Sequence, residues 1–127
     1  MILNRIFALL SVILILISCT PPEKINERWY QERWCALHDG KSEVRLKDNT
    51  RCDCILSDHA VEVDYARKWA EAIGQSLHYA RMTGENAGIL LIVEDAKDKK
   101  YLSRLEKVID HHNLPINVWT TKKSELN

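Results

Sequence analysis

The chain has 127 residues, of which 46% are hydrophobic, and its 18 basic and 18 acidic side chains give a formal net charge of zero. This length suits one domain rather than two, and the hydrophobic share is sufficient for a packed core. The balanced charge excludes a chain-wide positive field of the kind that attracts nucleic acid without specificity. Any such binding would need a local patch.

A short hydrophobic segment lies near the N-terminus. Residues 6–17 are apolar except for Ser11, and the one cation before them is Arg5. A membrane-spanning helix needs ~20 apolar residues, whereas the core of a secretory signal is shorter. The segment therefore favours a secretory signal.

The segment ends in Leu16-Ile17-Ser18-Cys19, which resembles the lipobox of bacterial lipoproteins. The resemblance implies that residues 1–18 are a signal peptide and that Cys19 carries the lipid that anchors the chain to the membrane. Residues 19–23, with two prolines that oppose helix formation, would form a tether. The alternative is an uncleaved short anchor with an incidental cysteine.

The lipoprotein resemblance also implies a location. The domain would be lipid-anchored in the cell envelope and would face the periplasm. Thr20 stands after the lipidated cysteine, where Asp would signal retention at the inner membrane. We therefore expect the outer membrane rather than the inner one.

Three further cysteines follow, Cys35, Cys52 and Cys54, which allow one disulfide and one remaining thiol. An oxidising compartment favours a bond from Cys35 to Cys52 or Cys54, and we take Cys35 and Cys54 as the possible pair. A zinc site that includes His38 or His59 is the competing interpretation. The C-x-C spacing is poor for zinc, and no fourth ligand is obvious.

Apolar periodicity predicts the secondary structure. Alternation of apolar and polar residues predicts strands, and apolar residues every three to four positions predict amphipathic helices. In chain order, we expect a helix at 24–36, strands at 42–46, 51–56 and 60–64, a helix at 65–82, a strand at 88–93, a helix at 98–112, a strand at 115–119 and a polar tail at 120–127.

The order of these elements predicts a fold class. Residues 88–93 form a continuous apolar run, which is typical of a strand covered on both faces. Three short strands with tight turns indicate an antiparallel meander, and the helix after them indicates a crossover to a parallel strand. We therefore expect residues 24–119 to form one α/β domain with a mixed sheet sandwiched by helices.

Acidic side chains share one face of the predicted meander. Glu62 and Asp64 alternate with two valines on the third strand, and a short turn brings Asp53 of the second strand near them. Clustered carboxylates repel one another unless a cation joins them, and Mg²⁺ is commonly held by one or two carboxylates plus water. The alternative is a solvated polar face with basic counter-ions.

The next helix adds a polar column. Lys68, Gln75 and Tyr79 fall on one side of the helix at 65–82, almost opposite its apolar stripe. Such a column could contact phosphate and base. An ordinary exposed helix face has the same composition.

The order Asp53, Glu62-Val63-Asp64 and Gln75-Ser76-Leu77-His78-Tyr79 resembles the PD-(D/E)XK nuclease superfamily, in the branch with a Q-x-x-x-Y helix motif. The resemblance covers roughly residues 24–95. It implies a restriction-endonuclease-like αβββαβ core, here with an extra helix and strand. It also implies metal-dependent hydrolysis of DNA or RNA, with Mg²⁺ as the possible cofactor.

Carried over residue by residue, the resemblance implies metal ligation by Asp53, Glu62 and an additional acid, Glu43. Gln75 and Tyr79 would position the nucleic acid or the metal site.

One departure concerns the lysine of the third strand, which is replaced by Asp64. Lys68 on the following helix is the candidate for supplying the missing ammonium group. The catalytic set is therefore Glu62, Asp64, Lys68, Gln75 and Tyr79. The departure leaves open an alternative, in which the domain is catalytically inactive and acts as a protein-interaction module. A third alternative is a structural envelope protein that is unrelated to nucleases.

The remaining histidines and the tryptophans are interpreted separately from this set. His111 and His112 close a predicted helix, where cations favour the helix dipole. His59 could carry a proton beside the third strand. The four tryptophans are expected as core anchors. We find no Ser-His-Asp arrangement with supporting motifs and no Gly-rich phosphate loop.

Overall fold

The computed structural model describes residues 19–127, and the predicted signal peptide at 1–18 lies outside the described residues. The described chain contains three α-helices and five strands. In chain order they are α1 (Glu27–Leu37), β1 (Lys41–Arg45), β2 (Arg51–Ile55), β3 (His59–Tyr65), α2 (Trp69–Thr83), β4 (Asn86–Ile92), α3 (Lys99–His112) and β5 (Ile116–Thr121).

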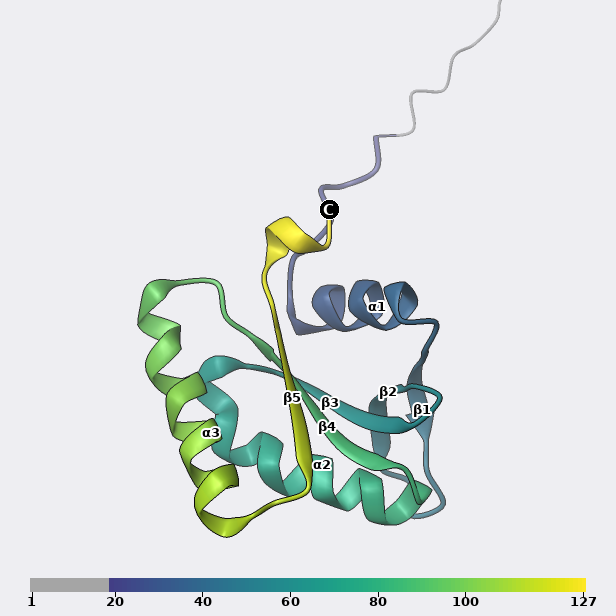
Figure 1. Cartoon of the computed structure of the whole chain (residues 1–127). Helices are drawn as coiled ribbons and strands as arrows, with labels where there is room; N and C mark the ends of the chain where they lie inside the picture. The colour runs from purple at the N-terminus through teal and green to yellow at the C-terminus, as the bar shows by residue number, and fades with distance from the viewer. Residues whose placement is uncertain (1–18) are drawn as a thin grey trace, which may run out of the picture.

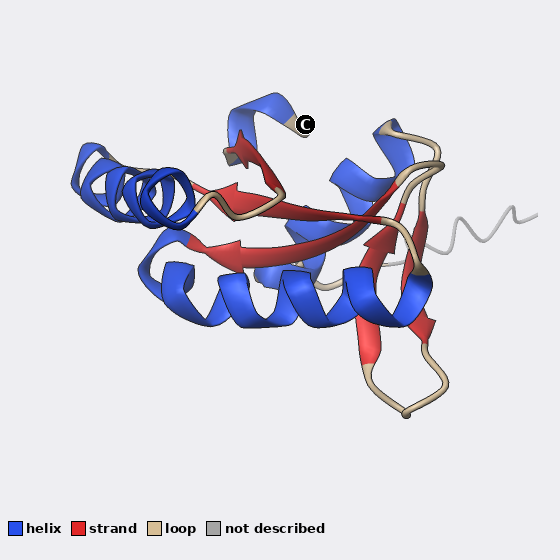
Figure 2. Ribbon diagram, turned by 60° about the horizontal axis from the view of Figure 1, so that its bottom comes forward, coloured by secondary structure: helices blue, strands red, loops and turns tan. Residues whose placement is uncertain are grey.

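The five strands form one mixed sheet in the order β1-β2-β3-β4-β5 (Figure 1). The β1–β2 and β2–β3 pairs are antiparallel, whereas β3–β4 and β4–β5 are parallel. Helix α1 covers one face of the sheet, and α2 and α3 cover the other (Figure 2). The predicted α/β fold with a mixed sheet between helices is confirmed.

The two faces of the sheet are packed differently. On the α1 side, Val61, Val63 and Leu90 join a core cluster with Trp29 and Trp34 of the helix. On the α2 side, the apolar packing comes from other residues of the sheet and from α2 and α3, including Ile89, Leu91, Ala72 and Leu105. Apolar burial on both faces holds the three layers together.

Strand register places two acids on the α2 side. Glu62 pairs with Ile89 and Asp64 with Leu91 across the parallel β3–β4 ladder, and paired residues point to the same face. Glu62 and Asp64 are therefore on the α2 side of the sheet, and both are buried.

Strands β2 and β3 pair over a short distance only. Their register consists of Cys54 with Val61 and Ile55 with Ala60. Beyond that point the hairpin of β1 and β2 turns away from the direction of β3 and β4 (Figure 2). The strands therefore form a fork, which here means the gap between β2 and β3 on the far side of the Cys54–Val61 pair.

Two expectations about the ends of the domain are wrong. The predicted polar tail at 120–127 is partly folded, because β5 continues to Thr121 and a 3₁₀ turn follows it. The turn lies close to α1 (Figure 1). Leu126 belongs to the core cluster that includes α1, and its side chain is 8% exposed. At the other end, α1 begins at Glu27 because Asn26 caps it, so Ile25 is exposed.

The disulfide joins Cys35 of α1 to Cys54 of β2, and Cys52 is a buried free thiol. Of the two pairings left open by the sequence, the structure thus has Cys35–Cys54. Gly40 lies directly against the bond, since a Cβ at this position would stand 2.6 Å from the sulfur of Cys54 and 2.7 Å from that of Cys35. The missing side chain leaves room for the bridge.

We predict that the disulfide stabilises the domain. It closes a loop with a sequence separation of 19, for which the chain-entropy model gives about 3 kcal/mol. Urea unfolding followed by tryptophan fluorescence should show a loss of about this size in the double variant Cys35→Ser, Cys54→Ser. Cys52→Ala is the control that keeps the bond. Equal unfolding free energies for the wild type and the double variant would contradict the prediction.

Candidate functional site

Carboxylates collect at the fork. Asp53 of β2 accepts a hydrogen bond at 2.8 Å from the backbone N–H of Val63, a group that the β2 backbone leaves unpaired. Glu62 and Asp64 of β3 lie beside it and are 4% and 2% exposed. The predicted grouping of Asp53, Glu62 and Asp64 is therefore present, and the fork is what brings it together.

Glu62 is the unusual member of this group. Its Oε2 atom is buried and has no hydrogen-bond partner among residues 19–127. Burial raises the pKa of Glu62 to about 10, and the charge of Asp53, a hydrogen bond with Asp53 and the charge of Asp64 add to the shift. Burial also raises the pKa of Asp53, although hydrogen bonds from Glu62 and from the backbone of Val63 oppose the shift. Without a cation, Glu62 therefore holds a proton at neutral pH.

Lys68 supplies the positive charge nearest to this group. It stands before α2, after a 3₁₀ turn at Ala66–Lys68, rather than inside the helix that the sequence predicted. Its Nζ atom is 3.4 Å from Asp64 Oδ1 and 3.8 Å from Glu27 Oε2. The charges of Asp64 and Glu27 raise the pKa of Lys68, so the ammonium group stays protonated.

Glu27 is a member of the site that sequence reasoning missed. It lies in the first turn of α1, and burial and its hydrogen bond with Asp64 raise its pKa to about 7. An acid at this position normally indicates only a favourable interaction with the helix dipole. Its contact with Asp64 depends on the fork, which no local pattern reveals.

Tyr79 and Gln75 of α2 face the same region. The Tyr79 hydroxyl donates a hydrogen bond to Gln75 Oε1 at 3.3 Å. Tyr79 is buried, because the small side chains of Cys52 and Ala60 leave room for its ring. Burial and the charge of Glu62 raise its pKa.

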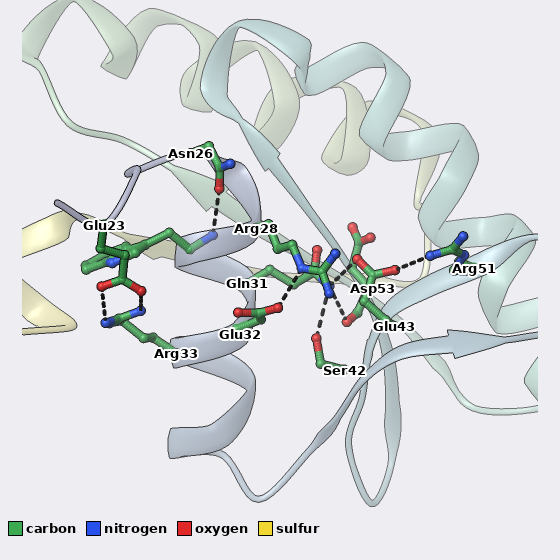
Figure 3. Close-up of polar contacts among 11 residues, drawn as sticks. Glu23, Asn26, Arg28, Gln31, Glu32, Arg33, Ser42, Glu43, Arg51 and Asp53 are labelled. Atoms are coloured by element: carbon green, nitrogen blue, oxygen red, sulfur yellow. Dashed lines mark hydrogen bonds and ion pairs between the residues drawn. The ribbon is translucent and has the colours of Figure 1, made fainter. Parts of the chain in front are cut away.

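Glu43 has other partners. Its carboxylate accepts a hydrogen bond from Gln31 Nε2 at 3.1 Å and lies 3.3 Å from Arg51 Nη1 (Figure 3). The Gln31 amide, which is buried and was missed from the sequence, also donates to the backbone oxygen of Asp53. Glu43 thus lies near Asp53, and its charge contributes to the raised pKa of that residue.

His59 and Cys19 lie outside the site. His59 bonds to Asp58 and Asn117. Cys19 is an exposed free cysteine at the start of the described chain. No helix within residues 19–127 is long and apolar enough to cross a membrane.

The donor set suits a hard divalent cation. Among the described residues, no group of three or more His, Cys, Asp or Glu side chains is arranged to hold a metal ion. Mg²⁺, however, is commonly bound by one or two carboxylates and otherwise by water and substrate phosphate. The unpartnered oxygen of Glu62 beside Asp53 fits that mode, because a cation would replace the proton that burial now favours.

Comparisons with protein-family models, with curated proteins and with solved structures found no match for this chain. The interpretation of the site therefore depends on its geometry.

We predict that Glu62 makes the metal-free domain less stable as pH rises. A glutamate that stays protonated when folded but ionises near its ordinary pKa when unfolded favours the folded state fully only below about pH 4.5. That contribution is lost progressively as pH rises toward 10. Glu62→Gln, which cannot ionise, should be more stable than the wild type by roughly 1–3 kcal/mol at about pH 7.

The measurement is urea unfolding of both proteins in EDTA from about pH 5 to about pH 9. The difference between them should shrink toward the acid end. Glu106→Gln, at an exposed position on α3, is the matched control and should show no such trend. A difference between wild type and Glu62→Gln that stays constant with pH would contradict the prediction.

Proposed function

We propose that this protein is an envelope-anchored lipoprotein whose domain is a divergent PD-(D/E)XK-like nuclease. In this proposal it hydrolyses phosphodiester bonds of nucleic acid with a divalent metal ion. The observation that carries the proposal is the buried, unpartnered oxygen of Glu62 beside Asp53 at the fork. A buried acid without a partner destabilises a domain, so its presence points to a ligand.

The arrangement around this acid supports the proposal. Asp53 and Glu62 would hold the metal ion, which would polarise the phosphate and activate a water molecule. Asp64 accepts a hydrogen bond from its neighbour Tyr65 and keeps Lys68 beside the carboxylates. The ammonium group of Lys68 can therefore approach a phosphate, as the lysine replaced by Asp64 would have done.

Tyr79 and Gln75 form the boundary of the site on the side of α2. Their hydrogen bond fixes the ring of Tyr79 next to Glu62 and shields that carboxylate from water. In the proposed reaction they keep the acids in place and leave a polar amide free to contact the substrate strand.

The second candidate is an inactive domain that acts as a protein-interaction module. Two observations favour it: Asp64 stands at the position of the lysine, and the described residues contain no ready three-ligand metal site. Under this proposal, Lys68 only neutralises Asp64 and Glu27.

The envelope location is part of the same proposal. It rests on the lipobox-like sequence before Cys19 and on the exposure of that residue, which leaves the thiol free for acylation. A disulfide-bonded domain also suits an oxidising compartment.

We predict metal-dependent cleavage of labelled DNA or RNA by the full chain in non-ionic detergent with Mg²⁺ or Mn²⁺. EDTA should abolish it. Asp53→Asn and Glu62→Gln should lower the rate by about 10³-fold or more, and Lys68→Met by about 10²-fold, because each removes a charge that the transition state needs. Lys68→Arg should keep more activity than Lys68→Met, and Glu106→Gln should match the wild type.

Metal binding separates the two candidates. Calorimetry with Mn²⁺ in buffers of different ionisation enthalpy should detect a proton released as the metal replaces it on Glu62. Wild-type protein that neither binds Mn²⁺ nor cleaves nucleic acid would overturn the nuclease proposal and favour the interaction module. Cleavage that persists undiminished in Glu62→Gln would also overturn it.

A further inference from the structure

A pocket of about 450 Å³ opens beyond the ends of β3 and β4. It adjoins the carboxylate site, because Tyr65 follows Asp64 directly and Arg67 precedes Lys68. The residues of its wall that carry aromatic or positive groups are Tyr65, Arg67, Lys97, Lys100 and Tyr101.

The acids in the pocket wall are engaged within the fold. Glu94 accepts hydrogen bonds from the Tyr30 hydroxyl, at 2.7 Å, and from the backbone N–H of Lys123. Asp98 accepts two backbone N–H groups at 3.1 Å each, and Asp95 caps the same turn in return. These carboxylates therefore accept hydrogen bonds from donors within the protein.

Two of the three cations in the wall lie over aromatic rings instead of pairing with acids. Arg67 stands 4.7 Å from the ring centre of Tyr65, and Lys100 stands 4.9 Å from that of Tyr101. Neither forms a salt bridge within the described part of the chain, whereas Lys97 pairs with Asp95. The wall thus places two cations without acidic partners beside two planar groups.

We propose that this pocket binds single-stranded nucleic acid and leads the strand to the carboxylate site. Bases stack on tyrosine rings or on guanidinium planes, and free cations contact phosphates, which is the chemistry of single-strand sites. A pocket of this size holds about one or two nucleotides and cannot enclose a paired duplex.

This inference rests on the proposed function for its biological meaning, but binding can be measured without catalysis. The full chain in non-ionic detergent and EDTA is titrated into a fluorescein-labelled oligothymidylate of about 15 nucleotides, with fluorescence anisotropy as the readout. An oligouridylate of equal length tests RNA. A duplex and an abasic deoxyribose-phosphate oligomer serve as competitors.

Substitutions at two positions test base stacking and phosphate contact separately. Tyr101→Leu should weaken binding about tenfold, whereas Tyr101→Phe keeps the ring and should bind like the wild type. Arg67→Gln should weaken binding and reduce the slope of log affinity against log salt by about 0.7, whereas Arg67→Lys should keep the slope. Glu106→Gln is the surface control.

The outcomes decide between this proposal and the nuclease proposal. Preference for single strands, with loss in Tyr101→Leu and Arg67→Gln only, supports the pocket. Equal binding by all variants, equal competition by the duplex or abasic oligomer, or no binding overturns it. Should the wild type bind the oligonucleotide in EDTA but cleave no nucleic acid with Mg²⁺ or Mn²⁺, the pocket would stand and the nuclease assignment would fall.

Discussion

The central constraint on the structure is the burial of three carboxylates, those of Asp53, Glu62 and Asp64. Each carboxylate has a different set of partners. Asp53 accepts a backbone hydrogen bond from Val63, and Asp64 is neutralised by Lys68. Within the described chain, Glu62 has neither a backbone donor nor a cation: it shares a hydrogen bond with Asp53, and its Oε2 atom is buried without a partner. The departures from regular strand pairing lie around this group.

The fork between β2 and β3 is the main departure. Because the strands stop pairing after Val61, the backbone of Val63 is free to bond to a side chain instead of a strand. The same gap lets residues of α1, on the opposite face of the sheet, reach the acids of the α2 face. Glu27 and Gln31 contact the group in this way. A fully paired sheet would separate these residues.

The sequence predicted the layers better than the details of the site. Period-two and helical patterns identified each strand and helix, since burial of one face leaves a regular mark on composition. The acids of β3 were found because alternation separates them from Val61 and Val63. Glu27 and Gln31 were missed because their roles arise from contacts across the sheet. The burial of Tyr79 could not be predicted from its helix, because it depends on the small size of Cys52 in β2 and Ala60 in β3.

The bond between Cys35 and Cys54 links two elements that both contribute to the site. Helix α1 carries Glu27 and Gln31, and β2 carries Asp53. In a reducing cytoplasm this cross-link would not form, and α1 would be held to β2 by packing and by the hydrogen bond from Gln31 to Asp53. Under the proposed nuclease function and envelope location, such an arrangement would delay full assembly of the acidic centre until the chain had been exported. The redox state of the compartment would then act as a maturation signal that keeps the newly made chain from cleaving the nucleic acid of its own cell.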